Sequence, residues 1–541
     1  MSPSPLRPAT SGVPLRDLTS SAGAGDLLRV ERPDAAPTDV VVTGVSLDSR
    51  SILPGDLYAA LPGFHAHGAD FAAGALAAGA VAVLTDPAGL ARMRGLDEIG
   101  PGSGPRVPVL LAEHPREVLG EVAATVYGHP AEALTVLGVT GTNGKTTTAY
   151  LIESALRARG QRTGLIGTVE TRIGDERLDS ERTTPEATDL HALLGIMRER
   201  GIDACVMEVS SHALELHRVD GVVYDVALFT NLSQDHLDFH ATMEDYFAAK
   251  ASLFTPARSR AAVVCVDDAW GARLARESSV PTVTFASAPA EGVDWVVDEG
   301  EGGAFDLAEV AGARVLSLVS HLPGHFNVAN TALAALALLT LGLDVPQVQE
   351  ALSVPPAVPG RMEVVAAGGP EGPRCIVDFA HTPDAVDAAL SALRPSTPGR
   401  LIAVLGAGGD RDRGKRPAMG AAAARQADIV VVTDDNPRSE EPADIRAAVV
   451  AGAREAVASG DARATEIIDG GSRSSAIAEA VAIAVLGAGS GDGVDTVVVL
   501  GKGHEKGQEI HGVKHPFDDR EAVRAALGAA LGAATSPGVG P

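Results

Sequence analysis

The most constraining feature of the sequence is a glycine-containing loop between an apolar run and a helical segment. Leu134–Thr140 is rich in strand-forming residues, the loop follows as Gly141-Thr-Asn-Gly-Lys-Thr-Thr147, and Thr146–Arg159 has the composition of a helix. Glycine amides and a helix N-terminus bind anions, and Lys145 adds a positive charge. The pattern therefore predicts a nucleotide site whose phosphate-binding residues are Gly141, Thr142, Asn143, Gly144, Lys145, Thr146 and Thr147.

The loop departs from the strict Walker pattern at one position. That pattern places a glycine at position 139, where this sequence has Val139. A glycine turn unrelated to nucleotides is the alternative, and the strand–loop–helix context argues against it. The Thr146 hydroxyl is suited to Mg²⁺. By itself the loop indicates ATP or GTP and no particular reaction.

The length and patterning of the chain indicate several domains. A chain of 541 residues exceeds what one core usually holds, and strand–helix alternation is typical of parallel sheets. We expect an α/β protein with an N-terminal mixed α/β domain (21–130), a central P-loop ATPase-like parallel sheet (131–355) and a C-terminal Rossmann-like domain (356–532). The Pro- and Gly-rich ends, 1–20 and 533–541, are expected to be disordered.

Composition and charge narrow the choice of partners. The net charge of −26 disfavours nucleic acid. No apolar run reaches the roughly 18 residues that span a bilayer, and the first twenty residues lack a signal-peptide segment. Cys205, Cys265 and Cys375 lie far apart, without metal-ligand spacing. We expect a cytoplasmic monomer with no nucleic-acid or membrane partner.

Three polar residues after the loop are candidates for catalysis. Glu208 ends an apolar strand, where an acidic side chain is well placed for Mg²⁺, although a surface carboxylate is the alternative. His236 lies in the polar segment Phe229–His240, but a lone histidine is usually structural. Lys250 lies in the amphipathic segment Asp245–Phe254, where a solvated charge is the ordinary role of a lysine.

Taken together, these segments resemble the Mur ligase family. The resemblance extends from about Val41 to Glu509 and is carried by Gly141–Thr147, Glu208-Val-Ser-Ser-His212, Asn231–Asp238, Lys250, Gly324-His-Phe-Asn327 and Pro359-Gly-Arg-Met-Glu363. In that family the first Walker glycine is absent, as at Val139. The resemblance implies that Lys250 is carbamylated to N6-carboxylysine. It further implies catalytic roles for Lys145, Lys250, Glu208 and His236, Mg²⁺ ligation by Thr146, Glu208, His236 and carbamylated Lys250, and ATP contacts at Asn327, Asn330, Arg361, Asp378 and His381.

Motifs in the first domain match the same family. Val45–Arg50, Gly55–Ala60 and Gly63–Gly68 are simple turns as bare sequence. The resemblance implies that they bind a uridine nucleotide sugar, and that a second group in the central domain holds the peptide of the same substrate. The implied residues for UDP-MurNAc-dipeptide are Leu47, Ser49, His65, Ala66, His67, Thr183, Thr184, Ser210 and Arg218.

Two arginine-rich loops follow strands in the third domain. Gly408–Pro417 and Thr433–Arg438 are solvated surface loops in the simplest interpretation, but their positions at strand ends favour carboxylate binding. Asp435-Asn-Pro-Arg438 is similar to the signature of members that select meso-diaminopimelate. Lysine lacks one of its carboxylates and would leave Arg438 unpaired, at a cost of a few kcal/mol. The implied site is Arg411, Asp435, Asn436, Pro437, Arg438, Gly501 and Glu505.

The resemblance implies one reaction and leaves three alternatives. The implied reaction is the ATP- and Mg²⁺-dependent addition of meso-2,6-diaminopimelate to UDP-MurNAc-L-Ala-D-Glu through an acyl phosphate, in peptidoglycan precursor synthesis. A lysine-adding ligase of the same family is disfavoured by Arg438. A folylpolyglutamate-type ligase is disfavoured by the first domain. A non-catalytic nucleotide switch is disfavoured by Glu208, His236 and Lys250.

Overall fold

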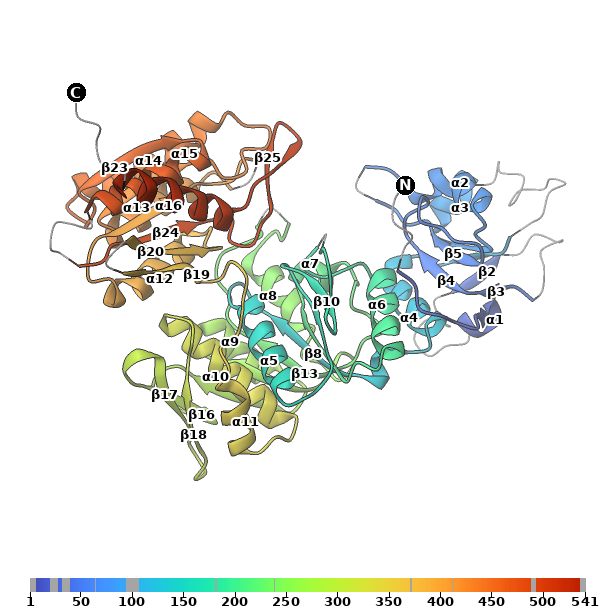
Figure 1. Ribbon diagram of the computed structural model, residues 1–541. Coiled ribbons are helices and arrows are strands. Elements are labelled where there is room, and N and C mark those ends of the chain that lie inside the picture. The colour runs from blue at the N-terminus through green and yellow to red at the C-terminus, as the bar shows by residue number, and fades with distance from the viewer. Residues whose placement is uncertain are drawn as a thin grey trace. The chain divides into compact units, whose positions relative to one another are not determined.

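The computed structural model describes residues 6–19, 28–31, 39–63, 65–93, 107–180, 182–237, 239–369, 372–410, 412–487 and 493–535. The chain divides into two compact units, one of residues 1–296, 309–314 and 333–354 and the other of residues 297–308, 315–332 and 355–541. Within the described residues, three β-sheets of five or more strands organise the fold (Figure 1). No described helix is both long and apolar enough to cross a membrane.

The first sheet has five strands in the order β2-β7-β6-β5-β4. Neighbouring strands from β4 to β7 are parallel, and β2 pairs antiparallel with β7. Leucines and valines of α4 and α1 pack on one face, and alanines of α2 pack on the other. The elements are β2 (Arg29–Glu31), β4 (Gly44–Ser46), β5 (Asp56–Ala59), β6 (Ala82–Thr85), β7 (Val109–Leu111), α1 (Leu15–Leu18), α2 (Ala72–Ala77), α3 (Pro87–Met93) and α4 (Pro115–Val126).

The two chain ends correct an expectation. The prediction that residues 1–20 are disordered is wrong for the segment that forms β1 (Val13–Pro14) and α1, because β1 pairs with β3 (Val41–Val42) and the side chains of Leu15 and Leu18 are buried. At the other end, α16 (Asp519–Thr535) continues three residues into the segment 533–541. Residues 1–5, 20 and 536–541 lie outside the described part of the chain.

The central sheet has the order β11-β10-β9-β12-β8-β13-β14-β15-β16-β17-β18. Strand β8 lies between β12 and β13, parallel to both, with Val139 opposite Glu208 and Thr140 opposite Phe229. The carboxyl ends of three strands therefore meet beside the phosphate loop. The strands are β8 (Thr135–Thr140), β9 (Thr163–Ile166), β10 (Thr171–Ile173), β11 (Glu176–Leu178), β12 (Ala204–Glu208), β13 (Tyr224–Phe229), β14 (Ser259–Cys265), β15 (Thr282–Ala286), β16 (Trp295–Glu299), β17 (Ala304–Glu309) and β18 (Val315–Val319).

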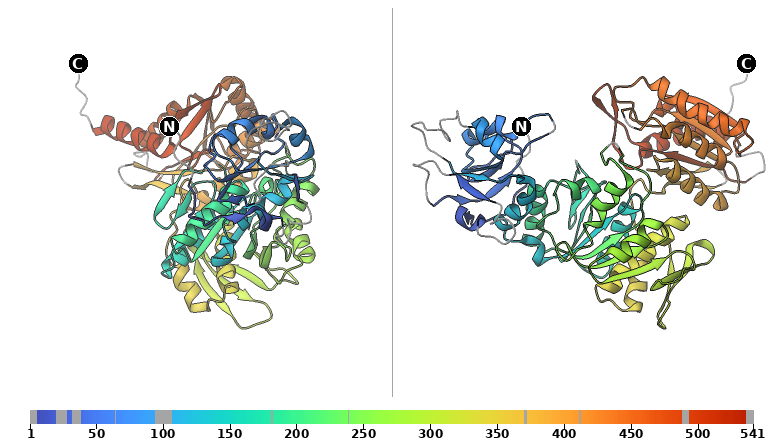
Figure 2. Two further views of the ribbon diagram at one scale, coloured as in Figure 1. Left: turned by 90° about the vertical axis from the view of Figure 1, so that its right-hand side faces the viewer. Right: turned by 180° about the vertical axis from the view of Figure 1, so that it is seen from behind.

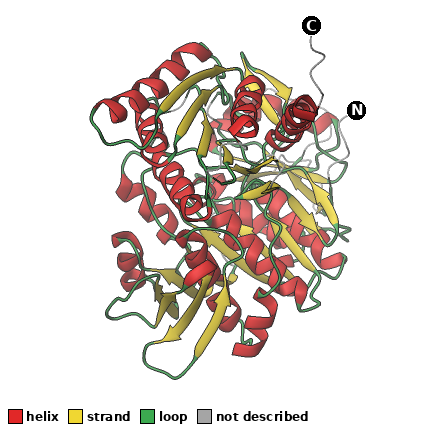
Figure 3. Cartoon of the chain, turned by 60° about the vertical axis from the view of Figure 1, so that its left-hand side comes forward, coloured by secondary structure: helices red, strands yellow, loops and turns green. Residues whose placement is uncertain are grey.

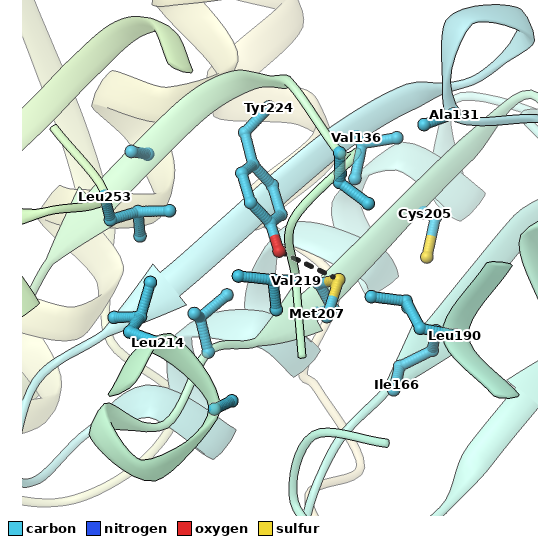
Figure 4. Packing of buried hydrophobic residues seen from close by; sticks show 14 of the residues in the cluster. Ala131, Val136, Ile166, Leu190, Cys205, Met207, Leu214, Val219, Tyr224 and Leu253 are labelled. Carbon is cyan, nitrogen blue, oxygen red and sulfur yellow. Dashed lines mark hydrogen bonds between the residues drawn. The ribbon is translucent and has the colours of Figure 1, made fainter. Parts of the chain in front are cut away.

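A glycine in the strand before the loop makes room for an aromatic ring. A Cβ on Gly138 would lie 2.8 Å from the ring of Tyr224, so a side chain at this position would collide with the ring. The Tyr224 hydroxyl donates to the sulfur of Met207 across 3.4 Å, within the apolar cluster of Figure 4.

Helices flank this sheet: α5 (Lys145–Ala158), α6 (Ala187–Glu199), α7 (Ser211–Glu215), α8 (Met243–Ala251), α9 (Ala269–Glu277), α10 (His325–Thr340) and α11 (Val345–Leu352).

The third sheet has six strands in the order β19-β20-β24-β21-β22-β23, with β19 antiparallel to β20 and the other pairs parallel. Its faces alternate along each strand: Ala403 and Leu405 pack with α12, α13 and α14, whereas Ile402 and Val404 pack with α15 and α16. Figure 2 shows the helices and strands of this part of the chain in orange to red, and Figure 3 distinguishes helices from strands by colour. The elements are β19 (Glu363–Gly369), β20 (Gly372–Asp378), β21 (Leu401–Leu405), β22 (Ile429–Thr433), β23 (Glu466–Gly471), β24 (Thr496–Leu500), α12 (Pro383–Leu393), α13 (Lys415–Gln426), α14 (Pro442–Ala458) and α15 (Arg473–Gly487).

The predicted α/β fold is confirmed. The apolar run predicted as a strand at 134–140 forms β8, and the strand predicted to end at Glu208 is β12. The strands predicted to precede the two arginine-rich loops are β21 and β22. The helix predicted after the loop is α5, which begins at Lys145. These segments were predictable because a buried parallel strand is a short continuous apolar run bounded by turn residues.

Candidate active site

The loop between β8 and α5 has the backbone of a phosphate-binding loop. Gly141 and Gly144 have φ angles of 147° and 87°, which disfavour any residue with a side chain. A Cβ on Gly141 would also lie 1.8 Å from the Thr230 hydroxyl oxygen. The Lys145 ammonium donates to the carbonyl oxygens of Gly141 and Thr142 across 3.0 and 2.9 Å, so its charge is held over the loop.

The polar segment after β13 holds this loop in place through hydrogen bonds. The Asn143 amide donates to the Asn231 side-chain oxygen across 3.0 Å, and the Thr142 amide donates to the Asn231 carbonyl across 2.8 Å. The Thr230 hydroxyl donates to the Asn143 carbonyl across 2.6 Å. The segment therefore holds the loop in its anion-binding form before any ligand arrives.

Glu208 lies at the end of β12 with its carboxylate fully buried. The Thr146 hydroxyl is 3.0 Å from both carboxylate oxygens, and Thr168 donates from its amide across 2.8 Å and from its hydroxyl across 3.1 Å. A buried carboxylate beside a loop hydroxyl is the oxygen set that Mg²⁺ prefers. Thr146 and Glu208, which are both predicted Mg²⁺ ligands, thus contact each other, and Thr168 is a third member of this group that the sequence did not reveal.

Lys250 is not the solvated helical lysine that its segment suggests. Its side chain is 1% exposed, and its ammonium nitrogen donates to the Gly141 carbonyl across 2.8 Å. Burial, and next the charge of Lys145, holds the pKa of Lys250 well below its usual value. The Tyr246 ring lies 4.7 Å from the same nitrogen, and its hydroxyl is 3.1 Å from that of Thr142. The site therefore favours an uncharged amine at Lys250.

His236 lies on the loop after β13 in the left-handed region, with φ of 54°, which is uncommon for a histidine. Partial burial, helped by nearby Lys145, lowers the pKa of its imidazole to about 4. The ring is therefore neutral at pH 7, as a metal ligand must be. Among the described residues, however, no three His, Cys, Asp or Glu side chains gather where they could hold a metal ion.

Four residues predicted for the peptide part of the substrate meet around Glu208. The Thr168 and Thr183 hydroxyls are 3.0 Å apart, and the Thr184 hydroxyl donates to the Glu208 carbonyl across 2.8 Å. The Ser210 amide donates to the Thr184 hydroxyl across 3.1 Å. Arg218 donates to the Thr184 carbonyl across 3.4 Å and lies 3.0 Å from Glu186. Thr183, Thr184, Ser210 and Arg218 thus form one continuous polar group.

A cavity of about 750 Å³ opens beside the first sheet. Leu47, Ser49 and Ala66 line it, together with Arg50, Tyr58, Arg116, Arg182 and Glu186. His65 is absent from the lining. The His67 ring is engaged elsewhere: it is 3.0 Å from Asp86, and its Nδ1 accepts from the Ala69 amide. His67 therefore serves as a cap of the short helix that follows it.

Two groups of residues predicted to contact ATP lie in the second unit. Asn327 and Asn330, in the first turns of α10, are buried and joined by a hydrogen bond of 3.1 Å. The Arg361 guanidinium lies 4.3 Å from the ring of Phe379, which also contacts His381. The Asp378 carboxylate accepts from the amides of Met362 and Ala380, across 2.7 and 2.8 Å. Asp378 therefore fixes the backbone at Met362, next to Arg361, and at Ala380, next to His381.

The two arginine-rich loops of the third sheet contact each other. The Gly409 amide donates to the Asn436 carbonyl across 2.9 Å, and an Arg438 Nη donates to the Gly409 carbonyl across 2.6 Å. The Asn436 side chain donates to the Glu505 carboxylate across 3.0 Å. Arg411, the other predicted arginine, lies outside the described residues.

Backbone strain marks the predicted selectivity residue. Arg438 has a φ of 51° and follows Pro437. Its amide donates to the Glu509 carbonyl in β25 (Gly507–Ile510), and its carbonyl accepts from the amide of His511, just after that strand. Its guanidinium is 3.4 Å from the Glu509 carboxylate. Non-glycine residues in this region cluster at functional sites because the surrounding structure must hold them there.

A further cation lies behind these loops. Lys502 is fully buried, and its ammonium donates to the Glu505 carboxylate across 2.7 Å and to the Asn436 side-chain oxygen across 3.0 Å. It thereby fixes the orientation of two predicted site residues. Gly501 and Glu505 are predicted from the sequence, but nothing in their spacing indicates that the lysine between them points inward.

The fold and this site define a nucleotide-dependent enzyme of one family. Three family models match the chain: "Mur ligase family, catalytic domain" at residues 41–127, "Mur ligase middle domain" at 139–339 and "Mur ligase, glutamate ligase domain" at 360–503. The chain belongs to the Mur ligase family, and it is an ATP-dependent ligase that forms amide bonds.

Among the relatives, one name recurs. A protein of Streptomyces avermitilis named UDP-N-acetylmuramoyl-L-alanyl-D-glutamate–2,6-diaminopimelate ligase is 51% identical over 97% of this chain and 98% of its own length. One of Corynebacterium glutamicum with the same name is 47% identical over 92% of this chain and 93% of its own length. A solved structure of an enzyme of that name covers 96% of this chain and 99% of its own, with a TM-score of 0.63 and 31% identity.

Proposed function

We propose that this chain joins meso-2,6-diaminopimelate to UDP-MurNAc-L-Ala-D-Glu at the expense of ATP, a step of peptidoglycan precursor synthesis. The observation that carries the proposal is the contact between the loop that holds Asn436 and Arg438 and the loop that holds Glu505. This contact sets a guanidinium and a carboxylate on neighbouring loops. Such a pair matches a substrate end that bears both a carboxylate and an ammonium. The names of the relatives agree with it.

The first chemical step activates the acceptor. A carboxylate oxygen of the D-glutamyl residue attacks the γ-phosphorus of ATP, the bond to the β–γ bridging oxygen breaks, and ADP leaves with that electron pair. The product is an acyl phosphate. Lys145 and the loop amides offset the charge that develops on the phosphoryl oxygens. Thr183, Thr184, Ser210 and Arg218 hold the acceptor peptide next to Glu208 in this scheme.

The second step forms the amide. The neutral amine of diaminopimelate attacks the acyl carbon, and a tetrahedral intermediate then expels inorganic phosphate while the nitrogen loses a proton. The loops around Arg438 and Glu505 bind the distal end of the amino acid. Because the distal end is held, the reacting amine is the end that can reach the acyl carbon. The protein lowers this barrier by orienting the two reactants and not by forming a covalent bond to either of them.

The metal requirement is part of the proposal. Thr146 and Glu208 would hold one Mg²⁺, and His236 with a carbamate on Lys250 would hold a second. When bound, Mg²⁺ would neutralise phosphate charge. A carbamate forms when a neutral amine adds to CO₂ and loses a proton. The low pKa and full burial of Lys250 support that step, because they keep its nitrogen lone pair free of a proton.

The expected specificity depends on the substrate carboxylate that binds Arg438. L-Lysine lacks that carboxylate, so the Arg438 side chain, which is 26% exposed, would keep only its contacts with Glu509 and the Gly409 carbonyl. A missing ionic partner costs on the order of 2–4 kcal/mol, which is at least tenfold in the ratio of kcat/KM values.

Arg411 and the uridine contacts of His65 and His67 remain predictions, as do the monomeric state and a cytoplasmic location.

An amino-acid panel tests the proposal. Purified enzyme with ATP, Mg²⁺ and UDP-MurNAc-L-Ala-D-Glu should release phosphate with meso-diaminopimelate at a rate at least about tenfold above that with L-lysine. Equal rates would favour the lysine-adding alternative. Release with a folate and glutamate would favour a folylpolyglutamate ligase, and ATP hydrolysis without any amino acid dependence would favour a nucleotide switch.

A further inference from the structure

A buried guanidinium beneath the third-sheet loops belongs to none of the groups described above. Arg473 is the first residue of α15, and its side chain is fully buried. Its Nε and one Nη donate to the two carboxylate oxygens of Asp519, each across 2.7 Å. Asp519, the first residue of α16, is equally buried. Two parallel hydrogen bonds between planar groups fix the orientation of both side chains.

The same guanidinium is bonded to the backbone at the root of both loops. One Nη donates to the Leu500 carbonyl across 2.8 Å, and the other donates to the Asp434 carbonyl across 3.3 Å. Leu500 immediately precedes Gly501, and Asp434 immediately precedes Asp435. Since a guanidinium is flat and rigid, it sets the distance between these two carbonyls in a way that a flexible ammonium cannot.

The two loops touch directly above it. A Cβ on Gly501, which has a φ of 113°, would lie 2.5 Å from a carboxylate oxygen of Asp435. The same oxygen is 3.8 Å from Arg473. A small change in loop spacing would therefore displace Asp435 or force it against the backbone of Gly501. Arg473 bonds the carbonyls of the two residues that precede these loops, so a change in its side chain would alter their spacing.

We propose that Arg473, held by Asp519, is a positioning residue for the amino-acid substrate: it fixes the spacing of the Asp435 and Gly501 loops, between which the distal end of the diamino acid binds. This inference rests on the proposed function. The competing explanation is that the pair only staples α15 to α16, which pack against each other on the same face of the sheet.

The two explanations differ in which kinetic constant changes. Arg473→Lys keeps the charge but cannot span both carbonyls and the carboxylate. It should raise the KM for diaminopimelate about tenfold or more, with the KM for ATP changed less than about twofold, and should lower selectivity over L-lysine. Asp519→Asn should act in the same direction. A merely structural pair would lower the midpoint of thermal unfolding and leave these ratios unchanged.

A matched control lies at the opposite edge of the same sheet. The Arg400 guanidinium also bonds a carboxylate through two nitrogens, at 3.1 and 2.7 Å from Asp495, and donates to the Ile483 carbonyl across 3.0 Å. Arg400 immediately precedes β21, and Asp495 immediately precedes β24, whose other end carries the Gly501 loop. Arg400→Lys should lower thermal stability without changing the KM for diaminopimelate.

The measurements separate the two explanations. A selective rise in the KM for diaminopimelate in Arg473→Lys and Asp519→Asn, but not in Arg400→Lys, supports the inference. A KM within twofold of the wild-type value in both variants overturns it. If Arg473→Lys does not fold, Asp519→Asn and calorimetric binding of diaminopimelate give the same decision. A wild-type enzyme that does not use diaminopimelate overturns the proposed function, and the inference with it, before any variant is compared.

Discussion

The ammonium nitrogen of Lys250 donates a hydrogen bond of 2.8 Å to the carbonyl oxygen of Gly141, the first residue of the phosphate loop. The contact joins α8 to the loop across 109 residues of sequence. A lysine this deeply buried is costly as a cation, so its environment favours the neutral amine. The structure thus places a reactive nitrogen directly beside the nucleotide loop.

Lys250→Met should retain the fold and lose activity by about a hundredfold or more, because it removes the carbamate and with it a metal ligand. Wild-type enzyme prepared in ¹³C-labelled bicarbonate should show a carbamate carbon resonance that disappears on acidification. Lys514→Met, at an exposed position of the hairpin β25–β26 (Val513–Pro516), is the control and should keep both activity and resonance. Full activity without any labelled carbon on Lys250 would refute the carbamate.

Thr168→Val should raise the apparent KM for Mg²⁺ and lower kcat, together by about tenfold, because the hydroxyl that orients Glu208 is lost while its amide remains. Thr168→Ser keeps the hydroxyl and should stay within about twofold of the wild type by the same reasoning. Initial rates over a range of Mg²⁺ concentrations measure the effect. Equal behaviour of the two variants would mean that Glu208 does not depend on Thr168.

Arg438→Asn should raise the KM for diaminopimelate by about tenfold to a hundredfold with little change in the KM for ATP. Asparagine tolerates the positive φ of this position better than most residues, so the variant removes the guanidinium without adding strain. Arg425→Ala, in α13 and paired at the surface with Asp461, is the matched control. A KM for diaminopimelate that does not change would remove Arg438 from the site.

Acid should destabilise the first unit through His191. Burial lowers the pKa of this imidazole from 6.5 to about 4, and one ring nitrogen is 2.9 Å from the Asp220 carbonyl. The unfolded chain takes up a proton near pH 6.5 and the folded chain does not. The stability that neutral His191 contributes is therefore complete above pH 6.5 and is lost as the pH falls towards 4.

The size of this effect can be isolated with His191→Gln, which cannot titrate. Between pH 6.5 and 4 the wild type should lose up to about 3 kcal/mol of unfolding free energy relative to the variant. Urea denaturation at a series of pH values measures the difference. Parallel pH profiles for the two proteins would show that His191 does not carry the acid sensitivity.

Much of the fold and part of the candidate site were predictable from local sequence. The apolar runs before Gly141 and Glu208 and the glycines of the loop act within a few residues of themselves, so their patterns determine strand, turn and helix directly. Residues 13–18 were misjudged because proline and serine nearby indicated disorder, while the burial of Leu15 and Leu18 depends on a sheet formed elsewhere in the chain.

The sequence by itself determined the phosphate loop, the alternation of strands and helices, and the motifs of the Mur ligase family. Only the tertiary structure decided that Lys250 is buried against Gly141, that Thr168 completes the environment of Glu208, and that Arg473 lies beneath the Asp435 and Gly501 loops. The reason is physical. Periodicity and turn chemistry act between near neighbours, whereas burial and ion pairing join residues that are tens of positions apart and become neighbours only when the sheets form.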